Sequence, residues 1–575
     1  MTKLHSLKVG IDFGTTYSGV AWAHTATPDE INVIQRWPAG GNRNSEKVPT
    51  EIAYSADGTS FKWGFELPLE SEKLIWIKLL LDPSKYDSDS ANSPLSKTKH
   101  LIPAGKEPVD VVADYLGALK RHTVDTLERN FGKEFLEATP IDWVMTVPAV
   151  WSDAAKATTL RAAEAAGLGE GTKIRMISEP DAAAVCTLRD IQPNSLRVDD
   201  TFIVVDCGGG TVDLISYQIT ALKPTLEVKE CAVGTGGMCG STYINANFEN
   251  FVRKRIGDDV FNAMKPKGRI VMLKHFDEFL KRTFSDEDED EDEDIFSCPI
   301  PGVADNEEAG VEDGFFILTR EEMKGIFDPV ISQIVGLVQK QMDAVESGDD
   351  GFDVSAILLV GGFGASEYLR QRLFKDLKST RNPDVEVEIL QPTNAWSAVV
   401  RGAVLRGLEG GIVRSRHARR NYGVNCTQAF DSNVHDEAEK YLSSFDGTPR
   451  VRDRAFWYIK KGDEVSEDKP ISFPFYNRWK THWDEEMVFE DDLVASELDE
   501  APIKTNSTDT YLVCKLTSRL PASIPKDIFP KRTSPYGFEY YDINYNLIMT
   551  VESATLTFEF EFEGKTYGSV TAKYY

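Results

Sequence analysis

The sequence is poor in cysteine, in long apolar runs and in positive charge, and each shortage excludes a class of protein. Its seven cysteines are odd in number and include no CxxC pair, which argues against a disulfide framework or a zinc site. No run approaches the ~20 apolar residues that a membrane span needs. The 64 lysines and arginines face 92 aspartates and glutamates, and the net charge of −28 argues against general binding to nucleic acid or acidic membranes.

Length and bulk composition are those of an ordinary soluble protein. The 575 residues predict two or more domains, and 41% hydrophobic with 27% charged residues is typical of globular chains. With no apolar targeting segment at the start, we expect a cytoplasmic protein, with the nucleus as the alternative. The acidic run Asp286–Asp294 repels itself and predicts a solvated loop, with a regulatory tail or a basic-partner site as the alternatives.

Two short stretches have nearly the same form although they lie 194 residues apart (206 − 12). Residues 9–16 and 204–211 each run from an apolar strand into an aspartate, a glycine-containing turn and a hydroxyl residue. The two aspartates are Asp12 and Asp206. Glycines let backbone amides approach a phosphate closely, and the hydroxyl adds a donor. The repetition predicts a duplicated fold that holds a polyphosphate from both sides.

The first 405 residues alternate short β-rich runs, glycine turns and helices, which is typical of an α/β fold. Apolar spacing predicts a helix over 109–131. A capping box of Thr319 and Glu322 predicts another helix that runs to about Val345. We therefore expect one α/β domain over residues 1–405.

The remaining sequence changes character. Residues 406–420 combine glycines with the basic stretch Arg414–Arg420, and we expect a linker there. An anion site in the basic stretch is the alternative to a charged linker or domain rim. Residues 421–575 alternate or run β-branched and aromatic between turn residues, which predicts a mainly β C-terminal domain.

Three carboxylates are candidates for a metal site. Asp12 and Asp206 end the repeated strands, and Glu179 precedes Pro180, which helps to fix its turn. Two carboxylates within ~4 Å repel by about 4 kcal/mol at an effective dielectric near 20, so a cation between them is expected. Magnesium is the natural choice because it prefers oxygen ligands and keeps several waters.

Three glycine turns supply the predicted nucleotide contacts. In the third turn, Leu358–Ser366, a base and ribose could lie against two glycines where a side chain would block them. The contacts that these turns predict are Gly14, Thr15, Thr16, Gly208, Gly209, Gly210, Thr211, Gly361 and Gly362.

These motifs carry a resemblance. Gly10–Ser18, Val205–Asp213 and Leu359–Ser366 resemble the nucleotide-binding domain of the heat-shock protein 70 chaperones. Val147–Ala149 and Glu179–Ala184 are similar to that family's connecting segments. The resemblance covers about residues 8 to 405. It implies a duplicated actin-like ATPase domain with two lobes that binds ATP or ADP with Mg²⁺.

The resemblance also implies roles for individual residues. Arg282 would stack on the adenine through a cation–π contact, and Lys78 would orient the water that attacks ATP in line. A surface ammonium on a buried stem is the alternative for Lys78. The further cofactor-binding residues are Tyr17, Glu278, Lys281, Ser285 and Phe363. The implied catalytic residues are Lys78, Glu179, Asp206 and Thr211, and the implied metal ligands are Asp12, Glu179 and Asp206.

The chain departs from the family pattern in three places. The family's acidic-leucine linker is missing between 405 and 420. Lys156 stands where the family has a signalling arginine, and a lysine cannot make a bidentate fork. The C-terminal part resembles neither the family's peptide-binding domain nor its helical lid. These departures indicate a divergent, atypical branch.

We therefore expect an ATP-hydrolysing, chaperone-like switch whose nucleotide state controls binding of a protein or peptide partner by the C-terminal domain. Co-chaperones and exchange factors are further candidate partners, and neither nucleic acid nor a membrane is expected. The alternative is a nucleotide-binding scaffold or interaction module with negligible ATPase activity. Filament formation and small-molecule phosphorylation are weaker hypotheses, because the chain carries an acidic run and shows no convincing aspartate base in a sugar-site loop.

Overall fold

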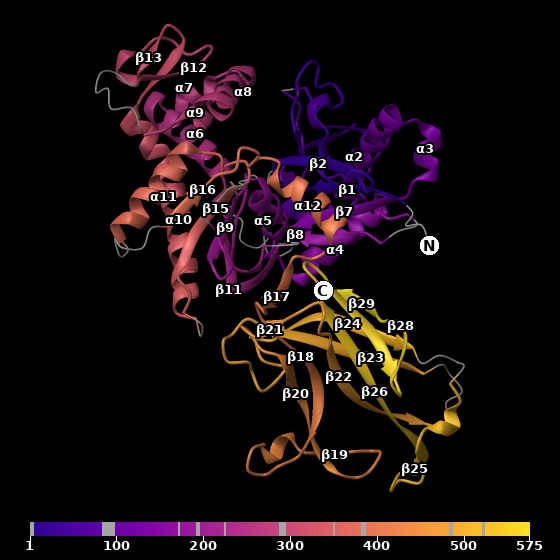
Figure 1. Cartoon of the computed structure of the whole chain (residues 1–575). Coiled ribbons are helices and arrows are strands. Elements are labelled where there is room, and N and C mark those ends of the chain that lie inside the picture. Colours follow the sequence, from indigo (N-terminus) through magenta and orange to yellow (C-terminus); the bar gives the residue numbers. More distant parts are fainter. Residues whose placement is uncertain are drawn as a thin grey trace. The chain divides into compact units, whose positions relative to one another are not determined.

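The computed structural model describes residues 5–68, 70–82, 98–170, 173–190, 196–222, 226–286, 295–348, 351–380, 387–481, 487–519 and 524–574. The chain divides into two compact units (Figure 1). The first unit comprises residues 1–151 and 158–413, and the second comprises residues 152–157 and 414–575.

The first unit contains two sheets with the same plan. In one lobe the order is β3-β2-β1-β7-β8, and in the other the strands run β11-β10-β9-β15-β16. In both, an antiparallel hairpin (β1 with β2, β9 with β10) is extended by parallel strands. This repeated topology confirms the predicted duplicated α/β fold. The strands are β1 Leu7–Asp12, β2 Tyr17–His24, β3 Asn32–Val33, β7 Ile141–Val147, β8 Arg175–Ser178, β9 Thr201–Cys207, β10 Val212–Ala221, β11 Glu227–Gly237, β15 Val354–Val360 and β16 Glu388–Leu390.

Central strands of these sheets are apolar on both faces. All seven residues of β9 are buried, as expected for a strand covered by helices on both sides. Asp12 is the last residue of β1, and Asp206 is the penultimate residue of β9. The equivalent strands therefore deliver one carboxylate each at the same end of the two repeated sheets.

Two helices cross at the centre of the first unit. They are α5 (Glu179–Asp190) and α12 (Ala398–Glu409). A Cβ atom at Gly402 would lie 1.7 Å from the carbonyl oxygen of Ala182, so only glycine allows this approach. Because α5 begins at Glu179, the crossing also fixes a predicted site residue.

The predicted helices are confirmed. Helix α2 spans Pro108–Phe131 and α10 spans Arg320–Glu346. The Thr319 hydroxyl accepts from the Glu322 N–H at 3.3 Å, and the Glu322 carboxylate accepts from the Thr319 N–H at 2.9 Å. The remaining helices are α3 Lys133–Ala138, α4 Asp153–Ala165, α6 Thr242–Ile256, α7 Asp258–Ala263, α8 Pro266–His275, α9 Lys281–Thr283 and α11 Glu367–Thr380, with short turns η1 Gly64–Glu66, η2 Ile77–Leu81, η4 Phe276–Leu280 and η5 Glu307–Ala309. None of the described helices has the length and apolar character needed to cross a bilayer.

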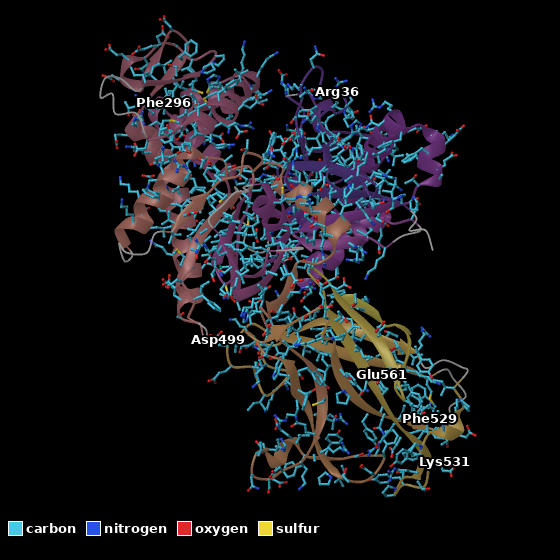
Figure 2. All side chains as sticks on the ribbon, in the orientation of Figure 1. Arg36, Phe296, Asp499, Phe529, Lys531 and Glu561 are labelled. Atoms are coloured by element: carbon cyan, nitrogen blue, oxygen red, sulfur yellow. The ribbon has the colours of Figure 1, made fainter. Side chains whose placement is uncertain are left out.

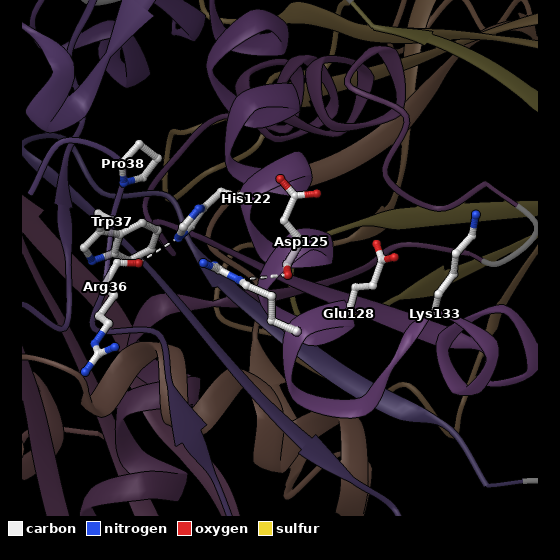
Figure 3. Close-up of a pocket in the computed structure, with 8 residues that line it drawn as sticks. Arg36, Trp37, Pro38, His122, Asp125, Glu128 and Lys133 are labelled. Atoms are coloured by element: carbon white, nitrogen blue, oxygen red, sulfur yellow. Dashed lines mark hydrogen bonds between the residues drawn. The ribbon is translucent and has the colours of Figure 1, made fainter.

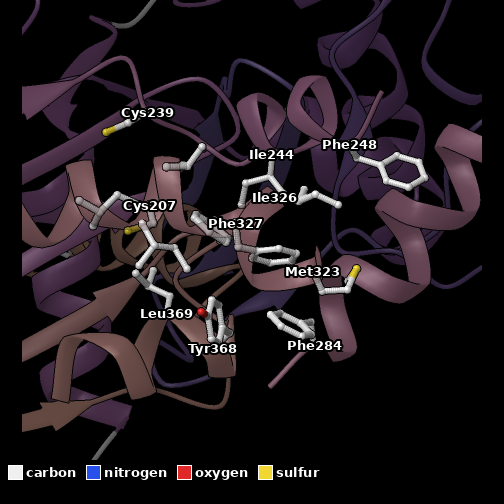
Figure 4. Packing of buried hydrophobic residues seen from close by; sticks show 14 of the residues in the cluster. Cys207, Cys239, Ile244, Phe248, Phe284, Met323, Ile326, Phe327, Tyr368 and Leu369 are labelled. Carbon is white, nitrogen blue, oxygen red and sulfur yellow. The ribbon is translucent and has the colours of Figure 1, made fainter. Parts of the chain in front are cut away.

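An aromatic core holds the second lobe together (Figure 4). Phe284 lies 4.8 Å from Phe327 and 4.6 Å from Tyr368 between ring centroids. Phe284 follows α9 directly, so its burial anchors the segment that carries the predicted adenine residues. Six further short strands belong to the described part of the unit: β4 Val48–Pro49, β5 Ile52–Tyr54, β6 Phe61–Trp63, β12 Ile295–Pro299, β13 Val311–Glu312 and β14 Phe315–Thr319, which pairs with β12 and β13.

The second unit is mainly β, as predicted. Its sheets have the orders β19-β20-β18-β23-β24-β29 and β22-β26-β27-β28, and side chains of both fill one core. Phe529 packs on Phe562 at 5.3 Å, and Phe489 stacks on Tyr545 at 4.8 Å between ring centroids. Figure 2 draws the side chains of this unit and labels Phe529. The strands are β17 Val413–His417, β18 Asn421–Ala429, β19 Tyr441–Leu442, β20 Pro449–Ile459, β21 Glu464–Val465, β22 Ile471–Lys480, β23 Val488–Ser496, β24 Tyr511–Arg519, β25 Lys531–Thr533, β26 Glu539–Val551, β27 Leu556–Phe562, β28 Lys565–Ser569 and β29 Thr571–Tyr574, with turns η6 Glu437–Glu439 and η7 Lys526–Ile528.

The expected linker over 406–420 has regular structure instead. Helix α12 continues to Glu409, and β17 takes up much of the basic stretch. The first turn of α4 belongs to the second unit, where Asp153 accepts from the Tyr422 hydroxyl at 2.8 Å and lies 3.5 Å from Arg420.

The acidic run lies outside the described residues except at its first position. Asp286 forms an ion pair with Lys324 at 2.7 Å, and its backbone N–H donates to Gln371 at 2.7 Å. The start of the run is therefore held against α10 and α11. The solvated-loop prediction for positions 287–294 stays a prediction.

Candidate functional site

A cavity of about 320 Å³ in the first unit gathers most of the predicted site residues. Those lining it are Asp12, Gly14, Thr15, Thr16, Tyr17, Lys78, Glu179, Asp206, Gly208, Gly209, Thr211, Lys281, Arg282, Gly361, Gly362 and Phe363. Three predicted residues, Gly210, Glu278 and Ser285, are not among its lining residues. Residues separated by hundreds of positions thus converge on one space.

The two repeated glycine turns meet in this cavity. A Cβ atom at Gly209 would lie 2.3 Å from the Thr16 hydroxyl oxygen, and one at Gly210 would lie 2.9 Å from Thr15. The Gly208–Gly210 carbonyls accept the first N–H groups around α6, including Thr242 N–H to Gly209 at 3.0 Å. The second turn therefore packs directly on the hydroxyl residues of the first. Gly210 belongs to this contact because it lies against Thr15.

Lysines engage two of the three predicted metal carboxylates. The Lys47 ammonium donates to Asp12 Oδ2 at 2.6 Å, with side chains only 8% and 5% exposed. Lys78, from η2, forms an ion pair with Glu179, and both are buried. The Asp206 side chain has neither a hydrogen-bond nor an ion-pair partner among the described residues. The three carboxylates consequently stand in different electrostatic environments.

Burial shifts the acidities of these carboxyl groups. It raises the pKa of Glu179 to about 7, with Asp12 and Asp213 adding to the effect and Lys78 opposing it. Burial also raises the pKa of Asp206 well above its ordinary range, reinforced by the neighbouring carboxylates. Glu179 can therefore exchange a proton near neutral pH.

The predicted adenine helix contains a wider turn than an α-helix. The Lys281 N–H donates to the carbonyl of Phe276, five residues earlier, so η4 is π-helical. The extra residue changes the register of the side chains. Asp277 lines the cavity, whereas Glu278 forms an ion pair with Lys274 at 3.7 Å. Glu278, which the resemblance places at the adenine, is therefore not among the residues that line the cavity.

Lys281 is held firmly at the cavity wall. Its ammonium pairs with the Asp277 carboxylate and donates to Asn245 Oδ1 at 3.0 Å. Burial lowers the pKa of Lys281, with Asp277 opposing and Arg282 adding to the effect. Burial alone would raise the pKa of Asp277, but the contacts with Lys281 and Asn245 outweigh it and lower the pKa. Asp277 thus remains an acceptor at neutral pH.

An aromatic and cationic wall lies next to this network. The Arg282 guanidinium carbon is 5.7 Å from the Trp396 ring centroid, and Tyr17 meets the same ring edge-on at 6.0 Å. A Cβ atom at Gly362 would come within 3.4 Å of the indole. Ser285 does not line the cavity, and its backbone carbonyl accepts from Arg320 at 2.7 Å.

The family relationship agrees with this geometry. Residues 104–411, more than half of the chain, match the family described as Hsp70 protein. The chain belongs to the Hsp70 family. Residues 416–575 match a separate domain of unknown function.

Three relatives of this Hsp70-family chain cover different shares of it. Human "Heat shock 70 kDa protein 12A" is 25% identical over 550 residues, covering 81% of this chain and 77% of the relative. Human "Heat shock 70 kDa protein 12B" is 24% identical over 534 residues, covering 79% and 74%. A "Chaperone protein HscA homolog" from Acinetobacter baumannii is 24% identical over 402 residues, covering 67% and 57%. The family supports a nucleotide-binding, chaperone-like function at a coarse level.

Several cavity residues were missed from the sequence. They are Lys47, Ser241, Thr242, Asn245, Asp277, Ala365, Ser366, Trp396 and Val399. Lys47 and Trp396 lie outside the Hsp70-like motifs, and a single lysine or tryptophan carries no spacing signal. Asp277 directly precedes Glu278 and could have been found only by allowing for a π-helical turn.

Hsp70-family proteins normally bind nucleotide together with Mg²⁺. Of the three predicted metal carboxylates, only one is not already paired with a lysine in the described part of the chain and so fits this ion. The described residues contain no group of three or more His, Cys, Asp or Glu side chains that could hold a metal. Asp12 and Glu179 are engaged by lysines, which leaves Asp206. Mg²⁺ is commonly bound by one or two carboxylates, waters and substrate phosphates. Asp206 fits this role, and the predicted cage of three carboxylates is not formed.

A second cavity of about 750 Å³ lies elsewhere in this Hsp70 domain (Figure 3). Its lining residues are Arg36, Trp37, Pro38, His122, Asp125, Glu128, Arg129 and Lys133. His122 contacts the carbonyl of Arg36 at 2.7 Å, and burial lowers the pKa of His122 while that carbonyl opposes. This cavity has mixed charges, contains no glycine turn and gathers none of the predicted site residues.

Proposed function

We propose that the protein binds ATP and hydrolyses it slowly, as a chaperone-like molecular switch. One observation carries this proposal: two glycine turns from repeated halves of the fold meet around a cavity that also holds Asp206, Lys47 and Lys78. Glycine turns suit phosphates because backbone N–H groups can come close, and buried ammonium groups supply the opposite charge. The aromatic wall at Trp396 suits a flat base.

The proposed chemistry is mainly positioning and electrostatics. The hydroxyls of Thr15, Thr16 and Thr211, with the backbone of the turns, would hold the phosphates. Lys78 would orient the attacking water between Glu179 and the γ-phosphate. Bound Mg²⁺ would supply neutralisation of phosphate charge. The substrate water would be deprotonated by a carboxylate of the cavity.

Asp206 is the strongest candidate for that proton acceptor. Its side chain lines the cavity and has no hydrogen-bond or ion-pair partner among the described residues, so both oxygens can accept a proton or a hydrogen bond. Glu179, with a pKa of about 7, is ion-paired and better suited to hold the water.

The C-terminal unit is proposed to bind a protein or peptide partner under control of the nucleotide. Its exposed surface supports this. The four described large apolar side chains that are at least 60% exposed, Val434, Leu442, Ile503 and Tyr536, all belong to this unit. Co-chaperones or exchange factors acting on the switch, and a cytoplasmic or nuclear location, stay predictions.

A second candidate function is a nucleotide-binding scaffold with negligible hydrolysis. The ion pairs favour it, because Asp12 and Glu179 are already neutralised by Lys47 and Lys78 and fewer carboxylates remain for catalysis. The two functions differ in turnover and agree on binding.

Phosphate release by the purified full chain separates the candidates. We expect slow release by the wild type and a loss of about 100-fold or more in Asp206→Asn, with thermal stability largely kept. Asp258→Asn, an exposed carboxylate on α7, serves as the matched control. Unchanged turnover in Asp206→Asn contradicts the proposed role, and binding without any release above a protein-free blank favours the scaffold. Stimulation by an unfolded peptide would support chaperone action.

A further inference from the structure

Lys47 is the feature of the cavity that the family motifs do not explain. It stands immediately before β4, and its ammonium is buried beside Asp12. The other Asp12 oxygen accepts from the Thr146 hydroxyl at 3.3 Å, so both carboxylate oxygens are engaged. The stem of Lys47 passes over Gly19, where an added Cβ would come within 3.3 Å of Lys47 Cγ. The first sheet is thus shaped to admit this side chain.

Lys47 and Lys78, two of the three lysines that line the cavity, are not equivalent. Lys78 is held between the Glu179 carboxylate and the Trp151 ring, whose centroid lies 5.4 Å from its ammonium. Among the described residues Lys47 forms one ion pair, with Asp12, and it lies on the cavity wall with the residues of the first glycine turn. Lys47 can therefore turn toward another anion without breaking any other ion pair of its own among the described residues. Lysine is a well-suited point charge for a phosphate.

We propose that Lys47 is a phosphate-binding residue that exchanges the Asp12 carboxylate for a phosphate oxygen of the bound nucleotide. Lys47 and Lys78 together then give the cavity two built-in positive charges. The consequence is that nucleoside di- and triphosphates bind even without a divalent cation, and that Mg²⁺ strengthens binding rather than permitting it. This inference rests on the proposed nucleotide-binding function.

The charge balance of the cavity supports the exchange. Asp12 would be left with its Thr146 hydrogen bond and with the opportunity to hold a metal-bound water. One carboxylate freed from its lysine is a better partner for a cation that arrives with the phosphates. Lys47 would therefore bind the phosphates whether or not a metal is present, and the Asp12 carboxylate that it releases would join Asp206 in binding the metal when one is present.

Nucleotide binding, measured by calorimetry with ATP and with ADP, tests the proposal without depending on turnover. Each protein is titrated in excess Mg²⁺ and in EDTA. In the wild type we expect EDTA to weaken binding by less than about tenfold. Lys47→Met should lose a further 10- to 100-fold in EDTA, which corresponds to one charge-assisted hydrogen bond. Lys47→Arg, which keeps the charge, should restore most of the loss.

Two further variants keep the experiment decisive. Lys47→Met leaves Asp12 buried and unpaired, which can unfold the protein, whereas the double variant Asp12→Asn with Lys47→Met removes both charges and is expected to fold. The double variant should also lose metal-free binding, with thermal unfolding as the check of folding. Lys133→Met, whose side chain is 72% exposed on α3, is the matched control.

The outcomes separate the inference from the function beneath it. Failure of the wild type to bind ATP or ADP in either buffer overturns the proposed function. Wild-type binding that requires Mg²⁺ overturns the inference alone. So does a folded Lys47→Met or double variant that binds in EDTA as tightly as the wild type.

Discussion

A single methyl group at Gly361 should damage both the fold and the site. Gly361 has a φ of +82°, and an added Cβ would lie 2.3 Å from Asp206 Oδ1 and 2.5 Å from the Cys207 carbonyl oxygen. Both atoms belong to the second glycine turn and its strand. The change Gly361→Ala therefore combines backbone strain with a collision against the carboxylate proposed to do the chemistry.

Gly410 provides the matched control. Its φ of +85° is nearly the same, but no described atom lies within 4 Å of the place that a Cβ would take there. The positive φ costs an alanine at least about 1–2 kcal/mol at either position, and Gly410, with a ψ of −165°, lies in a region nearly restricted to glycine. Overpacking at Gly361 should add about 1–3 kcal/mol. Gly361→Ala should thus lose at least about 2–5 kcal/mol of unfolding free energy, and Gly410→Ala at least about 1–2 kcal/mol.

Urea unfolding of the full chain, followed together with ATP binding, measures both effects. Gly361→Ala should weaken ATP binding because Asp206 has to move, while Gly410→Ala should leave affinity unchanged. Equal losses of stability in the two variants would refute the crowding argument, and full ATP affinity in a destabilised Gly361→Ala would refute the link to Asp206.

Three further predictions concern other parts of the chain. Trp396→Ala should weaken ATP binding by about tenfold while Trp396→Phe keeps it, because we propose that the ring stacks on the base. Equal ATP affinities of Trp396→Ala and the wild type in calorimetry would contradict this. Asp277→Asn should weaken ATP binding more than Glu278→Gln, because only Asp277 of the two lines the cavity. A larger loss of ATP affinity in Glu278→Gln would contradict this placement. Burial raises the pKa of Asp491 to about 6, so ionising this carboxyl group destabilises the fold: the cost is absent below about pH 4, grows as pH rises to 6 and persists above. Asp491→Asn should therefore raise the free energy of unfolding in urea by up to about 3 kcal/mol at about pH 7.5 and by little at about pH 4. A gain that does not depend on pH would exclude this cause.

Much of the first unit could be predicted because its signals are local and repeated. The aspartate–glycine–hydroxyl pattern around Asp12 and Asp206 states the duplication twice, and the Thr319–Glu322 box marks the start of α10 in adjacent residues. Each of these depends on neighbours in sequence, which a single chain displays.

The rest depended on tertiary contacts that no spacing reveals. Lys47 gains its role only by meeting Asp12 across the first sheet, and Trp396 only by facing Arg282. The resemblance named Glu278, whereas the π-helical turn before Lys281, which has no sequence signal, brings Asp277 to the cavity. The residues over 406–420 form helix and strand because their partners lie elsewhere in the chain.

The shared helix α4 has a practical consequence. Tyr422 and Arg420 find their carboxylate on Asp153, which is supplied by a segment 269 residues upstream of the tyrosine (422 − 153). A C-terminal fragment that begins after residue 413 would leave the Tyr422 hydroxyl and the Arg420 guanidinium without the Asp153 carboxylate. The upstream fragment would keep Asp153 at the start of α4 without these two partners. A single cut in the chain therefore cannot separate the second unit, for expression alone or for fusion to another protein, with all of its contacts intact.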